Sequence, residues 1–499
     1  MSAEEPIRGV LVAGGGIVGW SAAAALKRRL PQLSVAVIGD GAPTDAPAEL
    51  VAPTLPSIMG FHEDLGLREA DTVARAGSAL RLGTRFEGWA KGRPPYVHAY
   101  GAYGQPLGAT SFHHLWLRQA AAGRARPFDL YSPSAALAQA GRVPVPAGGA
   151  DGSAQPEYGL TLNLARYREM MRAFALHLGA TERPGSIGEV RLDPGTGFIA
   201  GLALTDGTEA RADLYVDCSG PSARLRSALG GGFADWGRWL PSDRLLLGQS
   251  APPSELPLLD RVEALKGGWR WRSASQRSAA HGVAYASGWM TDEEALEALS
   301  QSGAEADSAA LPLRQGQWLE PWSGNCVAVG DSAVCVEPLE WTNLHLAHSA
   351  IDRIVSMMPG RDCAPVELAE YNRQSRTEGE RVRDFIALHY VAAERPGEPF
   401  WEAAAAAEPP PSLAHTLALY RERGRLPFHE EETFSRDSWL AVLIGQGVVP
   451  RRLDPLVDAL SEARAEQALE LHEASVAAAA TGLPTHKDYL QALTRPARP

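Results

Sequence analysis

The pattern of apolar and polar residues at the start of the chain predicts a strand, a turn, a helix and a second strand. Residues 9–13 form a short apolar run, and a glycine-rich turn follows directly at residues 14–19. The alanine-rich stretch 20–30 is typical of a helix, which Pro31 ends, and residues 34–40 again have the pattern of a strand. This β-α-β order predicts an α/β fold built on a parallel sheet.

The glycine-rich turn carries the spacing GxGxxG at Gly14, Gly16 and Gly19. In dinucleotide-binding turns the first glycine permits the tight turn, the second lets a pyrophosphate approach the backbone, and the third lets the helix pack closely on the strand. Asp40, at the end of the second strand, is the candidate for holding a ribose hydroxyl, with a plain turn residue as the alternative. The turn therefore predicts a dinucleotide site.

Two later segments favour a flavin over a nicotinamide. Residues 213–219 have the pattern of a strand that ends in a turn at Gly220, and residues 326–333 contain a second apolar strand that ends at Gly330 and Asp331. In FAD-dependent monooxygenase-type proteins an aspartate after such a strand lies close to the ribityl chain. We therefore expect Gly330 and Asp331 to bind FAD, although Asp331 is equally suited to cap a helix.

The remaining pattern divides the chain into an α/β part and a helical part. Stretches rich in proline and glycine predict loops at residues 144–157 and 408–412, and apolar residues recur with helical spacing over residues 454–480. We expect a FAD-binding, Rossmann-like module with an additional sheet and inserted substrate-side segments over residues 1–395. A mainly helical subdomain is expected over residues 396–499.

Composition excludes several classes of function. The 499 residues carry a formal net charge of −12 without a basic run, which argues against binding to nucleic acid. No stretch approaches the roughly 18 apolar residues that span a bilayer, and the acidic N-terminus does not resemble a signal peptide. The four cysteines lack a CxxC spacing and no zinc motif is present, so we expect a cytoplasmic protein without a structural metal.

Collinear motifs along nearly the whole chain resemble those of the flavin-dependent tryptophan halogenase family. They are LGTRFEGW (82–89), FHHLWLR (112–118), DLYVDCSG (213–220), GWRW (268–271), EPLEWTNLHLAHSAI (337–351), YNR (371–373), RDFIALHY (383–390), PFW (399–401) and GQG (445–447). The resemblance implies a homodimeric oxidoreductase that takes reduced FAD from a separate flavin reductase. With oxygen, the flavin oxidises chloride or bromide to a hypohalous acid, which halogenates a small, electron-rich aromatic substrate.

The resemblance also assigns roles around the start of one predicted helix. Glu340 matches the family's catalytic glutamate, while Thr342 and Asn343 match the residues that hold the halide beside the flavin. Trp341 stands where the family has serine, and Asn343 stands where it has glycine. Judged without the resemblance, Glu340 is more readily explained as a carboxylate that caps or pairs at the start of a helix.

Arg81 is the main departure from the family pattern, because it stands in the place of the catalytic lysine. Only four residues of the chain are lysines, and none of them falls at that position. Arginine is always protonated but presents a planar fork of donors, so we expect Arg81 to orient the hypohalous acid or the substrate. The alternative is an arginine in an ordinary salt bridge.

His98 and Tyr100 lie in a segment that resembles the family's substrate pocket, where they would stack on an aromatic ring, with core packing as the alternative. Three functional hypotheses follow from the sequence. The first is halogenation of a tryptophan-like or indole-like substrate. The second is a monooxygenase or oxidase reaction on the same scaffold without halogenation, and the third is a non-catalytic flavin-binding protein.

Overall fold

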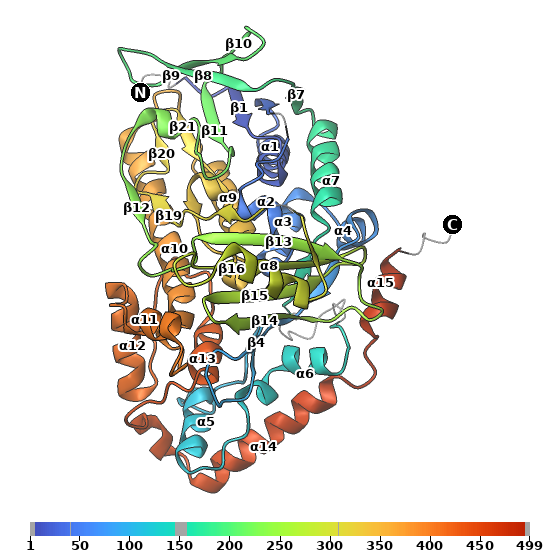
Figure 1. The fold of residues 1–499 in the computed structure, drawn as a ribbon, viewed down its shortest axis with the longest axis vertical. Helices are drawn as coiled ribbons and strands as arrows, with labels where there is room; N and C mark the ends of the chain where they lie inside the picture. The colour runs from blue at the N-terminus through green and yellow to red at the C-terminus, as the bar shows by residue number, and fades with distance from the viewer. Residues whose placement is uncertain (1–4, 40, 145–156, 308, 495–499) are drawn as a thin grey trace. The chain divides into compact units, whose positions relative to one another are not determined.

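In the computed structural model, which describes residues 5–39, 41–144, 157–307 and 309–494, the chain forms two compact units (Figure 1). Each unit is assembled from three stretches of the chain. Unit 1 comprises Met1–Ser78, Leu162–Leu245 and Leu311–Glu380, and unit 2 comprises Ala79–Thr161, Leu246–Ala310 and Arg381–Pro499. The boundary expected at 395/396 falls inside the last stretch of unit 2 and stays a prediction.

Unit 1 contains the predicted Rossmann-like sheet. Its strands follow the order β20 (Trp322–Ser323), β21 (Cys326–Ala328), β11 (Leu214–Asp217), β1 (Gly9–Ala13), β2 (Ser34–Ile38) and β7 (Thr181–Arg183). All neighbouring strands are parallel except β20, which runs antiparallel at the edge. The fold class expected from the sequence is therefore confirmed.

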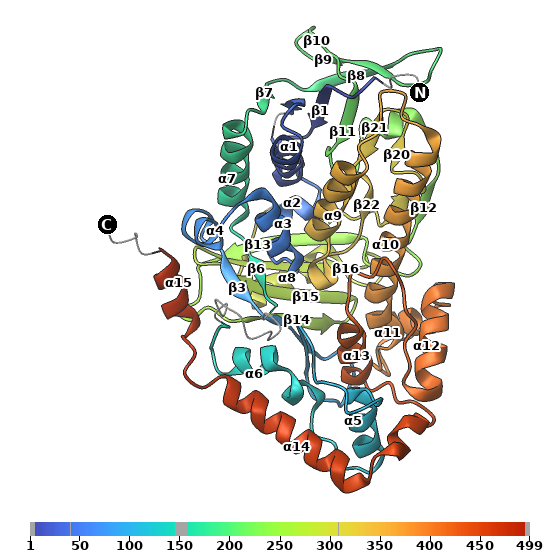
Figure 2. The same cartoon turned by 180° about the vertical axis from the view of Figure 1, so that it is seen from behind.

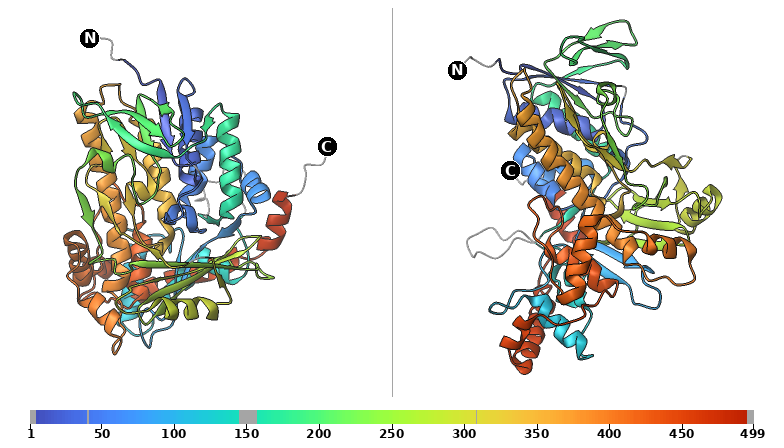
Figure 3. Two further views of the ribbon diagram at one scale, coloured as in Figure 1. Left: turned by 45° about the horizontal axis from the view of Figure 1, so that its top comes forward. Right: turned by 90° about the vertical axis from the view of Figure 1, so that its left-hand side faces the viewer.

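The side chains of alternate residues of β1 point to opposite faces of this sheet. Leu11 and Ala13 belong to a buried apolar cluster with a second sheet formed by β8 (Ile187–Leu192), β9 (Ile199–Leu204) and β10 (Glu209–Ala210). Val12 points the other way, toward Gly19 of α1 (Ile17–Arg29). Helices α7 (Leu164–His177) and α9 (Asn343–Ser356) pack against α1, as Figures 2 and 3 show.

Shorter elements complete unit 1. Helices α2, α3 and α4 follow β2, and α10 leaves the unit after Glu380. Three strands form a small sheet in the order β12, β19, β22. The bounds of these elements are α2 (Pro47–Leu50), α3 (Ser57–Leu65), α4 (Glu69–Ala76), α10 (Pro365–Val391), β12 (Phe233–Asp235), β19 (Gly316–Trp318) and β22 (Val334–Cys335).

Unit 2 is built on a larger, mostly antiparallel sheet, which α8 (Asp292–Gln301) contacts through β16 and β17. Thr291 and Glu294 form a capping box at the start of α8, which fixes where the helix begins. The main path of the sheet is β17 (Glu305–Ala306), β13 (Arg244–Ser250), β16 (Ala279–Tyr285), β15 (Gly268–Ala274), β14 (Leu259–Leu265), β4 (Gly83–Glu87) and β5 (Tyr96–Ala99).

The remaining helices of unit 2 are mostly C-terminal. They are α5 (Phe112–Ala121), α6 (Pro133–Gln139), α11 (Pro399–Ala406), α12 (Pro411–Arg423), α13 (Arg436–Gly445), α14 (Glu462–Ala479) and α15 (His486–Thr494). The single helix expected over 454–480 is interrupted, because Ser461 accepts the backbone N–H of Arg464 and starts α14 afresh. A short 3₁₀ turn, Pro455–Ala459, precedes it.

Helix α15 is tied to the short strand pair of β3 (Ala79–Arg81) and β6 (Gly159–Thr161) by one histidine. The ring Nε2 of His486 accepts the backbone N–H of Leu80 at 3.1 Å, so Nδ1 carries the proton that it donates to the carbonyl of Leu256 at 3.2 Å. This bond satisfies a backbone donor directly before Arg81, in a buried segment where an unpaired N–H is costly.

Buried histidines make the stability of the protein sensitive to acid. Burial lowers the pKa of His62 and of His486 to about 4, whereas an unfolded histidine titrates near 6.5. Both histidines are therefore neutral in the folded protein near pH 7. Their contribution to the free energy of unfolding is complete above pH 6.5 and is lost as the pH falls toward 4. We expect urea unfolding to show lower stability at pH 5 than at pH 7, by roughly 1.4 kcal/mol per pKa unit for each histidine. Equal stability at the two pH values would contradict this assignment.

Candidate functional site

The turn between β1 and α1 requires glycine at two of its positions. Gly14 has φ +123°, and a Cβ atom there would lie 2.3 Å from the carbonyl oxygen of Cys218. A Cβ atom on Gly19 would lie 1.9 Å from the carbonyl oxygen of Gly14, so only glycine lets α1 pack this closely on the turn. Both glycines thus have the geometric roles that the dinucleotide motif assigns to them.

A carboxylate occupies the N-terminus of α1. Glu49, on α2, accepts the backbone N–H of Ile17 at 2.6 Å and that of Val18 at 2.9 Å. A Cβ atom on Gly16 would lie 2.3 Å from Glu49 Oε1, so this glycine makes room for the carboxylate. Burial raises the pKa of Glu49, although its two backbone hydrogen bonds and the charge of Arg168 act in the opposite direction.

Asp331 lies close to the same place, in the 3₁₀ turn Gly330–Ser332 that follows β21. Its carboxylate accepts the backbone N–H of Ala48 at 2.7 Å, so it caps α2 rather than its own turn. Burial raises the pKa of Asp331 to about 7, and the nearby charge of Glu49 adds to this effect. Gly330 has φ +61°, which favours glycine, while Asp40 lies outside the described residues.

The two residues before Thr342 have an unusual backbone. Glu340 and Trp341 have φ values of 65° and 64°, a left-handed conformation that costs a residue with a side chain about 1 kcal/mol or more. Both side chains are buried. Such strain is concentrated at functional sites because the surrounding structure must impose it, and neither residue type signals this backbone conformation in the sequence.

Thr342 and Asn343 begin α9, and each has a buried polar atom that lacks a hydrogen-bond partner within the part of the chain that the structure describes. The atoms are Thr342 Oγ1 and Asn343 Oδ1. Asn343 Nδ2 donates to the carbonyl of Val336 at 2.8 Å and to Asp331 Oδ1 at 3.5 Å, so only an acceptor remains on its side chain. The Thr342 hydroxyl, which does not cap α9, remains able to donate to an anion at the positive end of the helix.

Arg81, in unit 2, is completely buried, and its guanidinium is committed to neighbouring side chains. Nε pairs with the buried carboxylate of Asp260, Nη1 donates to the hydroxyl of Tyr100, and Nη2 donates to Thr84 Oγ1 at 3.0 Å. Burial lowers the pKa of Arg81, but the charges of Asp260 and Tyr100 outweigh this and leave it above the usual value. Arg81 is thus a buried ion-pair partner that also fixes Tyr100.

His98 belongs to an aromatic cluster of unit 2 that borders a cavity. Its ring centroid lies 5.7 Å from that of Phe385, which stacks on Phe434 at 3.8 Å. Phe434 and Trp439 line a cavity of about 320 Å³, a volume that suits an indole-sized ligand. The sequence indicated His98 and Tyr100, whereas Phe434 and Trp439 carried no pattern that separates a pocket wall from helix packing.

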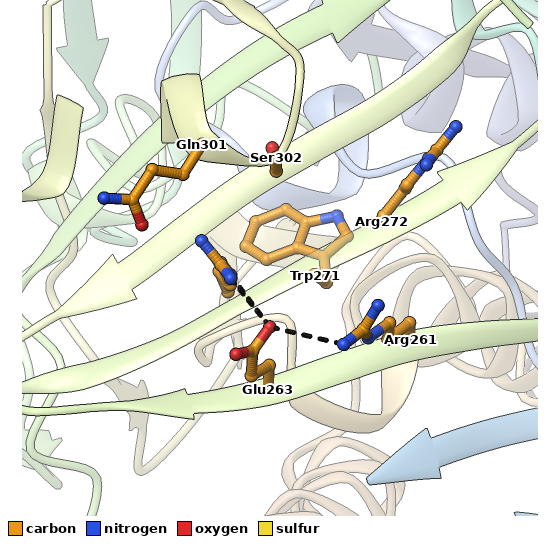
Figure 4. A pocket seen from close by; sticks show the side chains of 7 residues that line it. Arg261, Glu263, Trp271, Arg272, Gln301 and Ser302 are labelled. Atoms are coloured by element: carbon orange, nitrogen blue, oxygen red, sulfur yellow. Dashed lines mark hydrogen bonds and ion pairs between the residues drawn. The ribbon is translucent and has the colours of Figure 1, made fainter. Parts of the chain in front are cut away.

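A second cavity of unit 2, of about 190 Å³, lies between β14, β15 and the end of α8, and three arginines are among the residues that line it (Figure 4). Glu263 pairs with Arg270 at 2.8 Å and lies 3.9 Å from Arg261. Neither Arg81, His98 nor Tyr100 lines this cavity. The sequence-predicted site residues are therefore divided between the glycine turn and the start of α9 in unit 1 and the Arg81 and His98 region in unit 2.

The described ranges contain neither a metal-binding cluster nor a membrane-spanning helix. Within them no cluster of three or more histidine, cysteine or acidic residues is arranged to hold a metal, and the four cysteines are unpaired. No described helix has both the length and the apolar character needed to cross a membrane.

A dinucleotide-binding turn, a strained acidic turn and an aromatic cavity together define a flavin-dependent enzyme, and comparison with known proteins agrees. The profile of the tryptophan halogenase family matches residues 9–462, so the chain belongs to this family. The tryptophan 6-halogenase SttH of Streptomyces toxytricini is 27% identical, over 92% of this chain and 93% of its own.

Two solved structures share the whole fold. BrvH, a flavin-dependent halogenase from Brevundimonas sp. BAL3, is 34% identical with a TM-score of 0.91, over 98% of this chain and 99% of that one. Xcc4156, a flavin-dependent halogenase from Xanthomonas campestris, is 35% identical with a TM-score of 0.91, over 99% of this chain and 100% of that one. The resemblance found in the sequence motifs is therefore confirmed.

Proposed function

We propose that the protein is a FAD-dependent halogenase that acts on a small, electron-rich aromatic substrate of the tryptophan or indole type. The observation that carries the proposal is the buried hydroxyl of Thr342, which lacks a partner among the described residues and lies at the start of α9, directly after the strained Glu340–Trp341 turn. A family of flavin-dependent halogenases supplies the context. A separate flavin reductase, a homodimer and a cytoplasmic location are part of the proposal.

The residues of unit 1 fit FAD. The glycine turn and the N–H groups at the start of α1 would hold the pyrophosphate, and Asp331 would accept hydrogen bonds from ribityl hydroxyls. Gly16 has no side chain that would obstruct this approach, and the carboxylate of Glu49 shows that the N–H groups of Ile17 and Val18 accommodate an anion. When bound in its reduced form, FAD supplies the oxidising chemistry by reaction with oxygen.

The chain's own residues would orient the other reactants. The hydroxyl of Thr342 would donate a hydrogen bond to the halide, and the carboxylate of Glu340 would accept the proton that the substitution releases. In unit 2, His98 and Tyr100 would stack on the substrate ring. His98 lies against Phe385, which stacks on Phe434 in the wall of the cavity. Because every guanidinium nitrogen of Arg81 has a partner, its first role is to hold Tyr100, and contact with hypohalous acid stays a prediction.

A second candidate function is oxygenation of the same kind of substrate without halide. The contacts of Arg81 favour this second function. Arg81 stands where the family has its lysine, and its guanidinium is already bonded to Asp260, Tyr100 and Thr84. None of the four lysines of the chain falls at this position to bind hypohalous acid. The two candidates share the flavin site and the aromatic cavity, so they differ only in whether a halide takes part.

One coupled assay separates these functions. The protein is incubated with FAD, a flavin reductase, NADH, oxygen and bromide, and an indole panel is analysed by mass spectrometry. Products with the bromine isotope doublet support halogenation, whereas a gain of one oxygen that does not depend on bromide supports oxygenation. If FAD does not bind at micromolar concentrations, both candidates are wrong.

Replacing Thr342 with valine tests the halide contact. The hydroxyl is lost while the shape is nearly kept, so we expect the bromide concentration for half-maximal activity to rise about tenfold or more, as one hydrogen bond to a charged group is worth about 1.5 kcal/mol or more. Affinity for FAD should not change. Thr377→Val, at a half-buried position of α10 where the hydroxyl donates to the carbonyl of Arg373, is the matched control. An unchanged bromide dependence in Thr342→Val would disprove the contact.

A further inference from the structure

Glu49 stands where the proposed function needs a phosphate. The N-terminus of a helix has N–H groups without an intrahelical partner, and here the N–H groups of Ile17 and Val18 both donate to the Glu49 carboxylate. In dinucleotide-binding turns the pyrophosphate uses this same helix end. The carboxylate and the pyrophosphate therefore need the same donors.

Charge repulsion would also oppose the binding of a pyrophosphate beside Glu49, because the site is buried. Glu49 is 6% exposed, and Asp331, which is also buried, is close enough for the charge of Glu49 to raise its pKa. The cation whose charge acts on Glu49 is Arg168 of α7. A pyrophosphate would add negative charge to a site that already holds two carboxyl groups, and at low effective dielectric such like charges exclude one another.

From these contacts we propose that Glu49 is an internal competitor of the cofactor: its carboxylate fills the phosphate subsite at the start of α1 and has to leave when the pyrophosphate of FAD binds. This inference rests on the proposed FAD site. Glu49 stabilises the ligand-free protein by satisfying two buried N–H donors, and it weakens FAD binding by the same free energy. Weaker binding suits a flavin that is exchanged with a separate reductase.

The absence of a side chain at Gly16 leaves room for the Glu49 carboxylate in the ligand-free protein and for the pyrophosphate when FAD is bound. In the ligand-free protein the missing Cβ makes room for Glu49 Oε1, which would otherwise be 2.3 Å away. The second carboxylate near the turn, Asp331, is bound to the N–H of Ala48 rather than to α1, so it does not compete for the same donors. The competition is thus specific to Glu49.

The test compares Glu49→Gln with Glu63→Gln, an exposed glutamate on α3 of the same unit. The N–H groups of Ile17 and Val18 donate to different oxygens of Glu49, and the amide replaces one of these oxygens by an NH2 group. Thermal unfolding without ligand should therefore show a lower Tm. FAD binding, measured by titration of flavin fluorescence, should nevertheless become tighter, by roughly fivefold or more given the usual strength of charge interactions at a helix end. Glu63→Gln should match the wild type in both measurements.

The opposite signs of the two effects make the result decisive. A merely structural Glu49 would give a lower Tm together with weaker or unchanged FAD binding, and that result would overturn the inference. If Glu49→Gln weakens FAD binding without a change in Tm, the carboxylate binds the cofactor and the inference is equally wrong. If neither the wild type nor any variant binds FAD, the proposed function itself fails.

Discussion

Replacing Glu340 with glutamine is expected to lower kcat for halogenation at least 100-fold while leaving FAD affinity unchanged. The amide has nearly the same shape but cannot accept a proton, and a positioned general base contributes about 10²-fold to 10⁴-fold to a reaction rate. The strained backbone supports a functional role for Glu340, because its φ of 65° is maintained in a buried segment at a cost in free energy. Steady-state kinetics at saturating bromide and substrate measure the effect.

Glu367→Gln, an exposed change on α10, is the control for Glu340→Gln. Thermal unfolding of both variants should stay close to that of the wild type, so that a loss of rate cannot be attributed to unfolding. If Glu340→Gln keeps more than about one tenth of the wild-type kcat, the carboxylate has no part in proton transfer and Glu340 is a buried structural residue.

The second large effect concerns stability. Replacing Asp260 with asparagine leaves the guanidinium of Arg81 buried without its counter-charge, and breaking a buried ion pair in this way typically costs about 3–5 kcal/mol. We therefore expect urea unfolding of Asp260→Asn to show a loss of about 3 kcal/mol in the free energy of unfolding.

A double variant separates the ion pair from other effects. Arg81→Met combined with Asp260→Leu removes both charges, and apolar replacements of a buried pair are often neutral or stabilising. The double variant should therefore be more stable than Asp260→Asn. If the double variant loses as much stability as Arg81→Met and Asp260→Leu lose separately and added together, the ion pair does not stabilise the contact between β3 and β14.

The sequence was sufficient to predict the Rossmann-like sheet, the glycine turn and the start of α9. These features depend on local patterns: apolar runs of strand length, glycines at GxGxxG spacing, and family motifs in a fixed order. The predicted helix at residues 20–30 begins earlier, at Ile17, because the turn glycines themselves lead into it.

What the sequence could not predict depends on contacts between distant residues. Glu49 lies 32 residues after Ile17 in the sequence, and Asp260 lies 179 residues after Arg81. No local spacing therefore indicates either pair. The strain at Glu340 is likewise imposed by the packing around it rather than by its residue type. These long-range contacts place Arg81 in a buried ion pair with Asp260 and a hydrogen bond to Tyr100, while its contact with hypohalous acid stays a prediction.

The central claim is that the start of α9 holds a halide next to the flavin. A crystal loaded with FAD and soaked in bromide tests this most directly, because the anomalous signal of bromine locates the ion independently of any activity. We predict a bromide peak within hydrogen-bond distance of Thr342 Oγ1. A crystal with bound FAD and no bromide at Thr342 or Asn343 would contradict the claim and favour oxygenation without halide.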